Sequence, residues 1–549
     1  MSNNLRNQSK KNGKNLSLSE EIKELSKNKS AEEAAAHIND IYNVGLASIR
    51  GNKTFYDFSN TKNKVAICDG SACLVSNKQN KLKQELLKYF SEDEISEVTC
   101  LGLCHKNSAF MYNGKAYSTD NPEKIKDIIR YNIDSKITFP AYSSLKKPIL
   151  TKPWRGISKQ FDILLDYLKN PDSIIDELEK SKLRGRGGAG FPFHIKVRSC
   201  KETKSDKKYI ICNADEGDAG AYSDMYLMNE HPSKVLFGMV ATAIAIGADE
   251  GIVYIRGEYP SSITSMRKEI GKLYARGYLG ENVFNTKRRL HFKVVTGEGA
   301  YICGEETSLL NSAEGIRPEV RVRPPFPGEK GLFNHPSVVS NVETFANLFH
   351  ILYKGGAKYS KIGTEKSTGT KLLSLDSGFS KPGIYEVEMG TSLRDLIKSE
   401  AKGFDRKTKA IQVGGPLGGI IPIEYLIKLT IDFESFEENG FLLGHAGVIS
   451  LPVSTIFAEY VRHLFEFAAK ESCGKCNPCR LGTIRGYELF DKALNEDYLI
   501  DFDLFTDLLE TMKDTSLCAL GSGITLPIYN IMRHFGIELK PYFKEYRQM

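Results

Sequence analysis

Lys208-Tyr-Ile-Ile-Cys-Asn-Ala-Asp-Glu-Gly-Asp218 is a short apolar run that changes abruptly into a polar loop. Residues 208–212 have the composition of a buried strand, and amides and carboxylates follow where that strand would end. Helical and strand patterns alternate around it, with helices predicted at 160–182, 232–246 and 261–276 and strands at 251–255 and 290–296. This alternation predicts an α/β fold with a parallel, doubly wound sheet, whose ligands bind beyond the carboxyl ends of the strands.

Two further loops have the composition of a nucleotide site. Gly185-Arg-Gly-Gly-Ala-Gly-Phe-Pro192 precedes the strand, and Gly297-Glu-Gly-Ala-Tyr-Ile-Cys-Gly-Glu-Glu-Thr307 follows residues 290–296 and opens a helix. Without Cβ atoms, successive backbone N–H groups can cradle a phosphate, and Arg186 and Lys196 can add positive charge. Each loop alone could be a solvated surface turn, but three of them at strand ends predict a nucleotide-binding site.

Near the C-terminus, Ser472-Cys-Gly-Lys-Cys-Asn-Pro-Cys-Arg480 places three thiols at two-residue gaps, and a fourth follows at Cys518. One loop that wraps a cubane and a later segment that closes it are typical of a [4Fe-4S] site. Zinc also binds four thiolates, but usually through two C-x2-C pairs, so zinc and unligated thiols are the alternatives. We call Cys473, Cys476, Cys479 and Cys518 the C-terminal thiol quartet.

A second set, the N-terminal thiol quartet, consists of Cys68, Cys73, Cys100 and Cys104. A strand before Cys68, a helical pattern at 80–90 and glycine-rich turns at each pair predict a small α/β module that holds a [2Fe-2S] cluster at its edge. Two disulfides, a zinc site or an empty module are the alternatives, and a reducing compartment disfavours the disulfides. The remaining thiols have no partner at ligand spacing and are predicted to be small buried hydrophobes: Cys200, Cys212 and Cys303.

The length and the net charge of the chain limit its number of domains and its possible partners. A chain of 549 residues predicts three or four domains. The net charge is +7, but seven Lys/Arg against three Glu in residues 1–30 account for +4 of it, so nothing points to nucleic acid. The longest apolar run, 235–248, is too short to span a bilayer. We expect a cytoplasmic protein without membrane insertion, whose Asn/Lys/Ser-rich start is a disordered tail.

An ordered set of motifs gives a family resemblance over residues 150–530. The motifs are Arg184-Gly-Arg-Gly-Gly-Ala-Gly-Phe-Pro192, Cys212-Asn-Ala-Asp-Glu-Gly217, Tyr301-Ile-Cys-Gly-Glu-Glu-Thr307, Pro324-Pro-Phe-Pro327, Asn341-Val-Glu-Thr344 and the Cys473–Cys479 run. Together they resemble the FMN-containing, NADH-oxidising subunit of respiratory complex I and its relatives. The N-terminal quartet resembles the thioredoxin-like [2Fe-2S] module of the flavin subunit in electron-bifurcating hydrogenases, NAD-reducing hydrogenases and NAD-linked formate dehydrogenases.

Carried over residue by residue, the resemblance implies two groups of ligand-binding positions. Phe191 and Phe326 would sandwich the adenine of NADH, and Glu306 and Asp218 would lie near the nucleotide. His194 and His445 are expected to be structural, and no general acid or base is expected, because nicotinamide and flavin exchange hydride directly once Glu216 and Glu305 position them. The residues expected around FMN are Gly185, Arg186, Gly187, Lys196, Asn213, Asp215, Glu216, Tyr301, Gly304, Glu305, Val339, Asn341 and Thr344.

The same resemblance implies the domain order and the partners. We expect a tail (1–30), a thioredoxin-like [2Fe-2S] module (31–140), an FMN- and NADH-binding domain (150–360), a small β-rich, ubiquitin-like domain (361–450) and a helical [4Fe-4S] domain (451–549), with residues 136–153 as a linker. The expected function is hydride exchange between NAD(H) and FMN, followed by single-electron transfer to partners. These would be a small thioredoxin-like [2Fe-2S] subunit and a larger iron–sulfur catalytic subunit, with ferredoxin reached through them. A hydrogenase complex, with or without electron bifurcation, competes with formate dehydrogenase, transhydrogenase and a non-catalytic scaffold.

Overall fold

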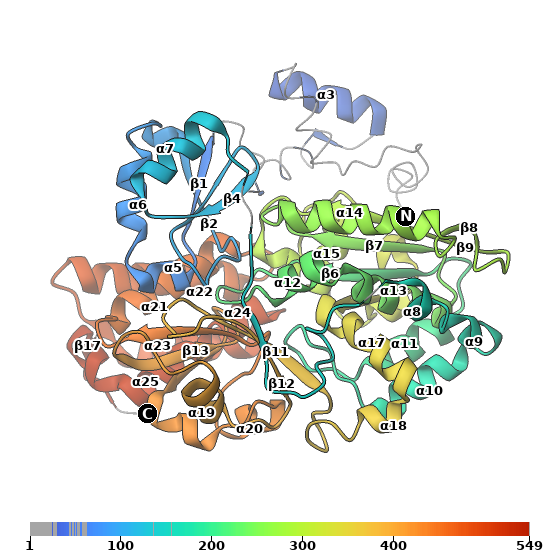
Figure 1. The fold of residues 1–549 in the computed structure, drawn as a ribbon. Coiled ribbons are helices and arrows are strands. Elements are labelled where there is room, and N and C mark those ends of the chain that lie inside the picture. The colour runs from blue at the N-terminus through green and yellow to red at the C-terminus, as the bar shows by residue number, and fades with distance from the viewer. Residues whose placement is uncertain are drawn as a thin grey trace.

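The computed structural model of the protein describes residues 25, 30–42, 45, 46, 49, 51, 55, 56, 63–134, 137–154 and 156–547. The predicted tail, residues 1–30, therefore lies outside the described residues apart from Leu25 and Ser30. Helix α3 (Ala31–Tyr42) precedes the strands in the chain. Figure 1 shows the small N-terminal module resting on a larger body, in which a parallel sheet and a second, mixed sheet lie next to each other.

The N-terminal module contains a four-stranded sheet in the order β2-β1-β3-β4. Strands β1 and β2 are parallel, whereas β3 pairs antiparallel with both β1 and β4. Its core is formed by apolar residues of the sheet and of α6 and α7, such as Phe110, Leu82 and Ile125. The elements are β1 (Val65–Cys68), α5 (Ser71–Ser76), α6 (Gln79–Leu86), η2 (Glu92–Glu94), β2 (Ile95–Val98), β3 (Ala109–Tyr112), β4 (Lys115–Ser118) and α7 (Pro122–Tyr131).

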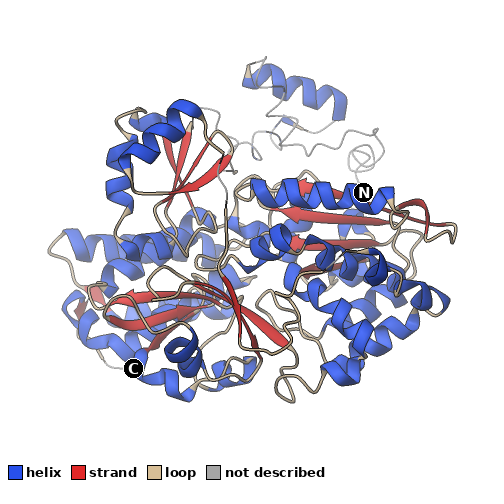
Figure 2. Ribbon diagram, viewed as in Figure 1, coloured by secondary structure: helices blue, strands red, loops and turns tan. Residues whose placement is uncertain are grey.

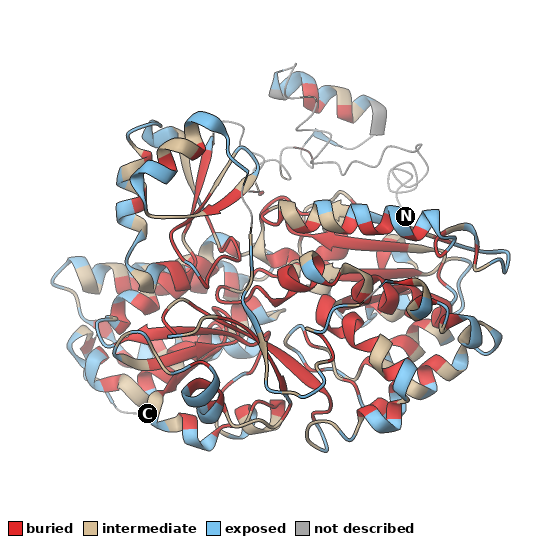
Figure 3. Cartoon of the chain, in the orientation of Figure 1, coloured by how far each residue is buried: buried red, intermediate tan, exposed pale blue. Residues whose placement is uncertain are grey.

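The central sheet has the order β10-β6-β7-β9-β8, and its first four strands are parallel, as the alternating pattern predicts. Strand β8 forms an antiparallel hairpin with β9. Helices cover the sheet, and α13 is buried along almost its whole length (Figures 2 and 3). The strands are β6 (Tyr209–Ala214), β7 (Glu250–Ile255), β8 (Gly280–Val283), β9 (Arg288–Thr296) and β10 (Ser337–Asn341).

The single helix expected at 160–182 is three short helices, which corrects the prediction. Pro171 explains the second break, because it cannot continue the helix before it and caps the next one. The helices are α8 (Ser158–Phe161), α9 (Leu164–Lys169), α10 (Asp172–Ser181), α11 (Phe193–Glu202), α12 (Ser223–Glu230), α13 (Pro232–Ile246), α14 (Pro260–Ala275), η3 (Tyr301–Gly304), α15 (Glu306–Ala313), α16 (Pro327–Lys330), η4 (Leu332–Asn334), α17 (Val342–Lys354) and α18 (Gly356–Tyr359).

The β-rich region forms a six-stranded mixed sheet in the order β14-β13-β15-β11-β12-β5. Its edge strand β5 (Ala141–Ser143) comes from the segment expected to be only a linker. The buried Glu386 carboxylate explains this, since it accepts hydrogen bonds from the backbone of Ile149, Leu150 and Thr151 and so fixes the segment on the sheet. The other elements are β11 (Thr370–Leu375), β12 (Gly383–Glu388), α19 (Leu393–Asp395), η5 (Leu396–Glu400), β13 (Thr408–Val413), β14 (Gly419–Pro422), η6 (Ile423–Lys428), α20 (Phe433–Glu438) and β15 (Gly447–Pro452).

The C-terminal region is predominantly helical. Its core contains Leu464, Phe490, Phe505 and Ile528, which come from four different helices. Among the described residues, no helix is both long and apolar enough to cross a membrane. The elements are α21 (Phe457–Glu471), α22 (Asn477–Asn495), β16 (Ile500–Asp501), α23 (Phe502–Thr515), α24 (Ala519–Gly523), α25 (Thr525–Leu539), η7 (Lys540–Tyr542) and β17 (Phe543–Lys544).

Polar contacts attach the N-terminal module to this body. Lys470 of α21 pairs with Asp69 and Glu97, at 3.8 and 3.3 Å, and His463 Nε2 lies 3.3 Å from Ser71 Oγ. On the other side, the backbone N–H of Ser377 donates to the Cys104 carbonyl oxygen (3.0 Å). The loops that carry the N-terminal thiols are therefore held against the C-terminal helices and the mixed sheet.

Candidate active site and thiol clusters

Four loops meet at the carboxyl edge of the central sheet, and we call them the edge cluster: residues 183–192, 213–218, 297–307 and 339–344. Strands β6 and β10 are in parallel register with Asn213 opposite Asn341, so their loops leave the sheet side by side. The glycine loop packs against this end, because a Cβ at Gly187 would lie 3.0 Å from Asn341 Cβ. The Arg186 backbone N–H donates to Thr344 Oγ1 (2.9 Å) at the start of α17.

Arg186 differs from the prediction. Its guanidinium is fully buried and donates to the carbonyl oxygens of Thr368 and Arg184, so it supports the loop from inside and is not available to a phosphate. Lys196 supplies the charge instead. Its Nζ lies 2.6 Å from Glu306 Oε2 and 3.2 Å from the Val339 carbonyl oxygen. The structure thus brings together Lys196 and Val339, which were expected to bind FMN, and Glu306, which was expected to bind NADH.

The β6 loop is held by side chains from the loop that follows β9. Asn213 Nδ2 donates to the Gly304 carbonyl oxygen (2.8 Å), and Tyr301 OH donates to Asp218 Oδ1 (2.8 Å). Burial raises the pKa of the Asp215 carboxyl well above its usual value, and its Oδ2 has no hydrogen-bond partner. Glu305 Oε2 caps α15, whereas its Oε1 is buried without a hydrogen-bond partner and lies 3.8 Å from Arg323 Nη1. The loops therefore present two buried oxygens without hydrogen-bond partners.

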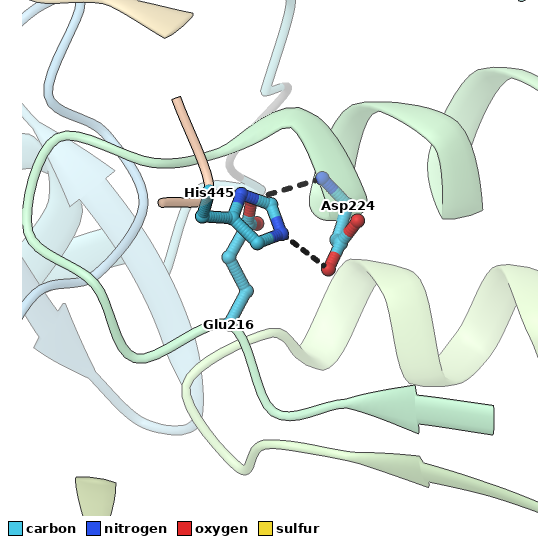
Figure 4. Close-up of side chains that lie close together, drawn as sticks. All are labelled: Glu216, Asp224 and His445. Atoms are coloured by element: carbon cyan, nitrogen blue, oxygen red, sulfur yellow. Dashed lines mark hydrogen bonds and ion pairs between the residues drawn. The ribbon is translucent and has the colours of Figure 1, made fainter. Parts of the chain in front are cut away.

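Beneath these loops lies a buried group of three ionisable side chains, Glu216, Asp224 and His445 (Figure 4). His445 Nε2 lies 3.1 Å from Asp224 Oδ2, and its Nδ1 lies 3.5 Å from Glu216 Oε1. Burial alone would lower the pKa of His445, but the two carboxylates outweigh it and raise the pKa to about 9. Asn341 Nδ2 donates to the same Asp224 oxygen (2.6 Å), which links the group to the edge cluster.

The same three residues have the spacing of a small metal site, since their ligand atoms lie within 4.8 Å of one another. However, the Glu216 carboxylate already accepts hydrogen bonds from the backbone of Asp224 and Met225 and from Tyr259 OH. A protonated imidazole paired with both carboxylates offsets their charge without a metal. Glu216 is thus an anchor at the start of α12, and His445 has a charged structural role.

Two exposed aromatic rings, Phe191 and Phe326, flank segments that pack beside the central sheet. Phe191 and Phe326 are 47% and 54% exposed, although large aromatic side chains are usually mostly buried. They directly precede Pro192 and Pro327, at the starts of α11 and α16, and these helices pack together, with a Cβ at Gly328 only 2.9 Å from Ser199 Oγ. The start of α16 thus lies against Ser199 in the second half of α11, and exposed rings such as Phe191 and Phe326 are suited to stacking against a planar ligand.

The C-terminal quartet is gathered where three helices meet. Cys473 follows α21, Cys476 and Cys479 lie at the start of α22, and Cys518 directly precedes α24. A Cβ at Gly521 would lie 2.8 Å from Cys479 Cβ, so α24 approaches the first turn of α22 closely. Burial raises the pKa of Cys479 to about 11 and that of Cys518 to about 12, so these thiols need a bound cation to ionise near neutral pH.

The N-terminal quartet is fully buried. Cys100 Sγ lies 3.5 Å from Cys104 Sγ, and the Gly102 backbone N–H donates to Cys100 Sγ (3.4 Å). The hydrogen bond from Cys104 lowers the pKa of Cys100 to about 7. Each of the other three thiols is buried, as predicted: Cys200, Cys212 and Cys303.

Loops suited to a nucleotide, together with two sets of four thiols, are the features of an iron–sulfur flavoprotein. Models of three families match the chain: the Nuo51 FMN-binding domain over residues 178–350, the NADH-ubiquinone oxidoreductase-F iron-sulfur binding region over residues 459–542, and the thioredoxin-like [2Fe-2S] ferredoxin over residues 3–132. The chain belongs to the family of FMN- and iron–sulfur-containing NADH oxidoreductase subunits. The predicted fold class, NADH-oxidising function and cofactors, FMN, [4Fe-4S], [2Fe-2S] and NAD(H), are confirmed.

Individual relatives come from two kinds of complex. The chain is 35% identical to the mitochondrial NADH-ubiquinone oxidoreductase 51 kDa subunit of Aspergillus niger, over 69% of this chain and 78% of that protein. It is 39% identical to the NADP-reducing hydrogenase subunit HndC of Solidesulfovibrio fructosivorans (72% and 80%) and 32% identical to the NAD-reducing hydrogenase HoxS subunit alpha of Cupriavidus necator (89% and 85%). A crystal structure of an air-oxidized NAD+-reducing [NiFe]-hydrogenase aligns with a TM-score of 0.84 at 27% identity, over 96% of this chain and 93% of that one.

Several residues that support the site were not predicted from the sequence. Asp224, Arg256 and Tyr259 all contact Glu216, yet none belongs to a glycine-rich loop or a cysteine motif. The Arg-Gly-Glu-Tyr run at 256–259 directly after a predicted strand was an available signal, since charged residues at a buried strand end need partners.

Proposed function

We propose that the edge cluster holds FMN, with the nicotinamide nucleotide entering beside Phe191 and Phe326. FMN accepts a hydride from NADH and releases electrons singly, which a pyridine nucleotide cannot do. The observation that supports this is the convergence of the glycine loop, Lys196 and the unsatisfied oxygens of Asp215 and Glu305 at one sheet edge. Lys196 suits a phosphate, and the two oxygens suit hydroxyl and N–H donors.

The remaining residues then have defined tasks. Gly185, Gly187 and the backbone of Arg186 would line the phosphate side, and Val339, Asn341 and Thr344 would support it from β10 and α17. Asn213, Tyr301 and Gly304 hold the loops on the other side. Asp218 and Glu306 would face the nucleotide. No acid or base is required, so these residues act by orienting two rings and excluding water.

The thiol quartets would carry the electrons away. We assign Cys473, Cys476, Cys479 and Cys518 to the [4Fe-4S] cluster and Cys68, Cys73, Cys100 and Cys104 to the [2Fe-2S] cluster. The C-terminal quartet includes two partly exposed thiols, Cys476 and Cys518, so that cluster would face a partner, whereas the N-terminal quartet is wholly buried.

Among the complexes that contain such subunits, a hydrogenase-type assembly fits this chain best. The C. necator hydrogenase chain and the hydrogenase crystal structure match it over 89% and 96% of its length, N-terminal module included. The partners would be a small thioredoxin-like [2Fe-2S] subunit and a larger iron–sulfur catalytic subunit, with ferredoxin reached through them, in the cytoplasm. An NAD-linked formate dehydrogenase is the competing assembly.

The test is anaerobic purification of the chain with iron, sulfide and flavin analysis and EPR spectroscopy. We expect one FMN and about six irons, four from a cubane and two from a [2Fe-2S] cluster. The chain alone should pass electrons from NADH to artificial one-electron acceptors, but should reduce neither protons nor ferredoxin without its partners. About two irons per chain, or robust ferredoxin reduction by the chain alone, would contradict the proposal.

A further inference from the structure

Arg256 connects the N-terminal module to the edge cluster. It directly follows β7, is only 4% exposed, and donates from Nη2 to the carbonyl oxygen of Thr99 (3.0 Å), the residue before Cys100. Its Nη1 donates to the Glu216 carbonyl oxygen (2.5 Å). One guanidinium thus touches the backbone next to a cluster ligand and the backbone of a flavin-site loop.

Glu258 forms a buried ion pair with Arg256. Its Oε1 lies 2.7 Å from Arg256 Nη2, it is also 4% exposed, and its Oε2 has no hydrogen-bond partner. A buried ion pair beside a redox centre is not screened by solvent, so each member acts on the centre over a longer range than a surface charge does.

Tyr259 and Gly102 show how closely the two regions approach. Tyr259 OH donates to Glu216 Oε2 (3.2 Å), and the Arg256 Cζ atom lies 5.0 Å from the centre of the Tyr259 ring. Gly102, between Cys100 and Cys104, has a φ of +67°, and a Cβ there would lie 2.5 Å from Met225 Cε and 2.8 Å from the Tyr259 ring. The thiol loop therefore packs directly on Tyr259 and on Met225 of α12. Arg256, paired with Glu258, bridges the backbone before that loop and the backbone of Glu216.

We propose that Arg256 and Glu258 are positioning residues that set the reduction potential of the cluster held by the N-terminal quartet, Arg256 raising it and Glu258 lowering it. The proposal rests on the assignment of this quartet to a [2Fe-2S] cluster. One-electron reduction adds a negative charge to the cluster, which a nearby buried cation stabilises and a nearby buried anion opposes. A pair that only braced the backbone would not produce shifts of opposite sign.

The experiment is an EPR-monitored redox titration of the full-length, anaerobically purified chain with Arg256→Gln, Glu258→Gln and the double substitution. We expect the midpoint of the [2Fe-2S] signal to fall in Arg256→Gln and to rise in Glu258→Gln. Each shift should correspond to about a tenfold change in the reduction equilibrium, or about 59 mV for one electron. The double variant should return close to the wild-type value. The [4Fe-4S] signal is the internal control, and Arg198→Gln, which breaks the exposed pair with Glu179, is the matched variant.

The outcomes separate the two proposals. Absence of a [2Fe-2S] signal from the wild-type chain overturns the cluster assignment, and this inference with it. A normal signal whose midpoint stays fixed, or moves in the same direction in both single variants, refutes the role of Arg256 and Glu258 and leaves the assignment intact. If Arg256→Gln does not fold, the direction of the Glu258→Gln shift decides, because that variant keeps the guanidinium and its bonds to Thr99 and Glu216.

Discussion

Replacing His445 by glutamine should change the pH dependence of stability in a calculable way. The imidazole is buried between Asp224 and Glu216, and its pKa is raised from 6.5 to about 9. Glutamine can keep a hydrogen bond to Asp224 but carries no charge. The wild-type chain therefore has a buried cation below pH 9 that the variant lacks at every pH.

Linkage between protonation and folding gives the magnitude. The folded pKa lies about 2.5 units above the unfolded value, and each unit is worth about 1.36 kcal/mol, so protonation of His445 contributes about 3 kcal/mol. Because the folded pKa is the higher one, this contribution is complete below pH 6.5 and is lost as the pH rises through 9. For a cooperative folding unit of about 150–250 residues, about 3 kcal/mol corresponds to about 6–12 °C in melting temperature.

Thermal melting of the FMN-loaded chain between pH 6 and pH 10 measures this effect. The melting temperature of His445→Gln should lie well below that of the wild type at pH 6, and the gap should close as the pH approaches 10. His231→Gln is the matched control, because burial lowers the pKa of His231 to about 3 and it carries no charge in this range. If the melting temperatures of the wild type and His445→Gln differ by the same amount at pH 6 and at pH 10, His445 is not charged in the folded chain and the reasoning is wrong.

Three further predictions concern the ligands. Glu306→Gln should raise kcat/KM for NADPH relative to NADH by about tenfold, or about 1.4 kcal/mol, because the Glu306 carboxylate would accept ribose hydroxyls and repel a 2'-phosphate. Faster NADPH oxidation by the wild type would contradict this, and Arg323, 3.5 Å from Glu306, is then the residue to exchange. Gly187→Ala should weaken FMN binding about tenfold in fluorescence titrations, because its Cβ would lie 3.0 Å from Asn341, whereas Gly271→Ala, with nothing within 4 Å, should not. Cys518→Ser should remove about four irons and the cubane EPR signal while the [2Fe-2S] signal remains. The control Cys200→Ala should keep both EPR signals. An unchanged iron content in Cys518→Ser would exclude Cys518 as a cluster ligand.

Sequence patterns predicted what depends on local periodicity. The strand before Asn213 and helix α13 lie within two residues of the predicted bounds, because buried apolar runs and glycine stops specify both. The cysteine motifs could be recognised because the spacing within Cys473–Cys479 and within each N-terminal pair is local, and the structure brings Cys518 near Cys479 through α24. The edge strand β5 could not, since it forms by pairing with β12, which lies more than two hundred residues further along the chain. The direction of Arg186 and the charge of His445 likewise depend on partners that no local pattern specifies.

Each thiol quartet is linked to the edge cluster through one charged side chain. Glu471, two residues before Cys473, accepts a hydrogen bond from the Tyr301 backbone N–H (2.8 Å), and Tyr301 in turn bonds Asp218. On the other side, Arg256 joins Thr99 to the Glu216 carbonyl oxygen. Asp218 and Glu216 belong to the same loop, so both quartets are fixed relative to that short segment. A donor bound there would therefore face two acceptors at set positions, and a substitution within residues 215–218 should disturb both, whereas a change at Arg256 or Glu471 should disturb only one.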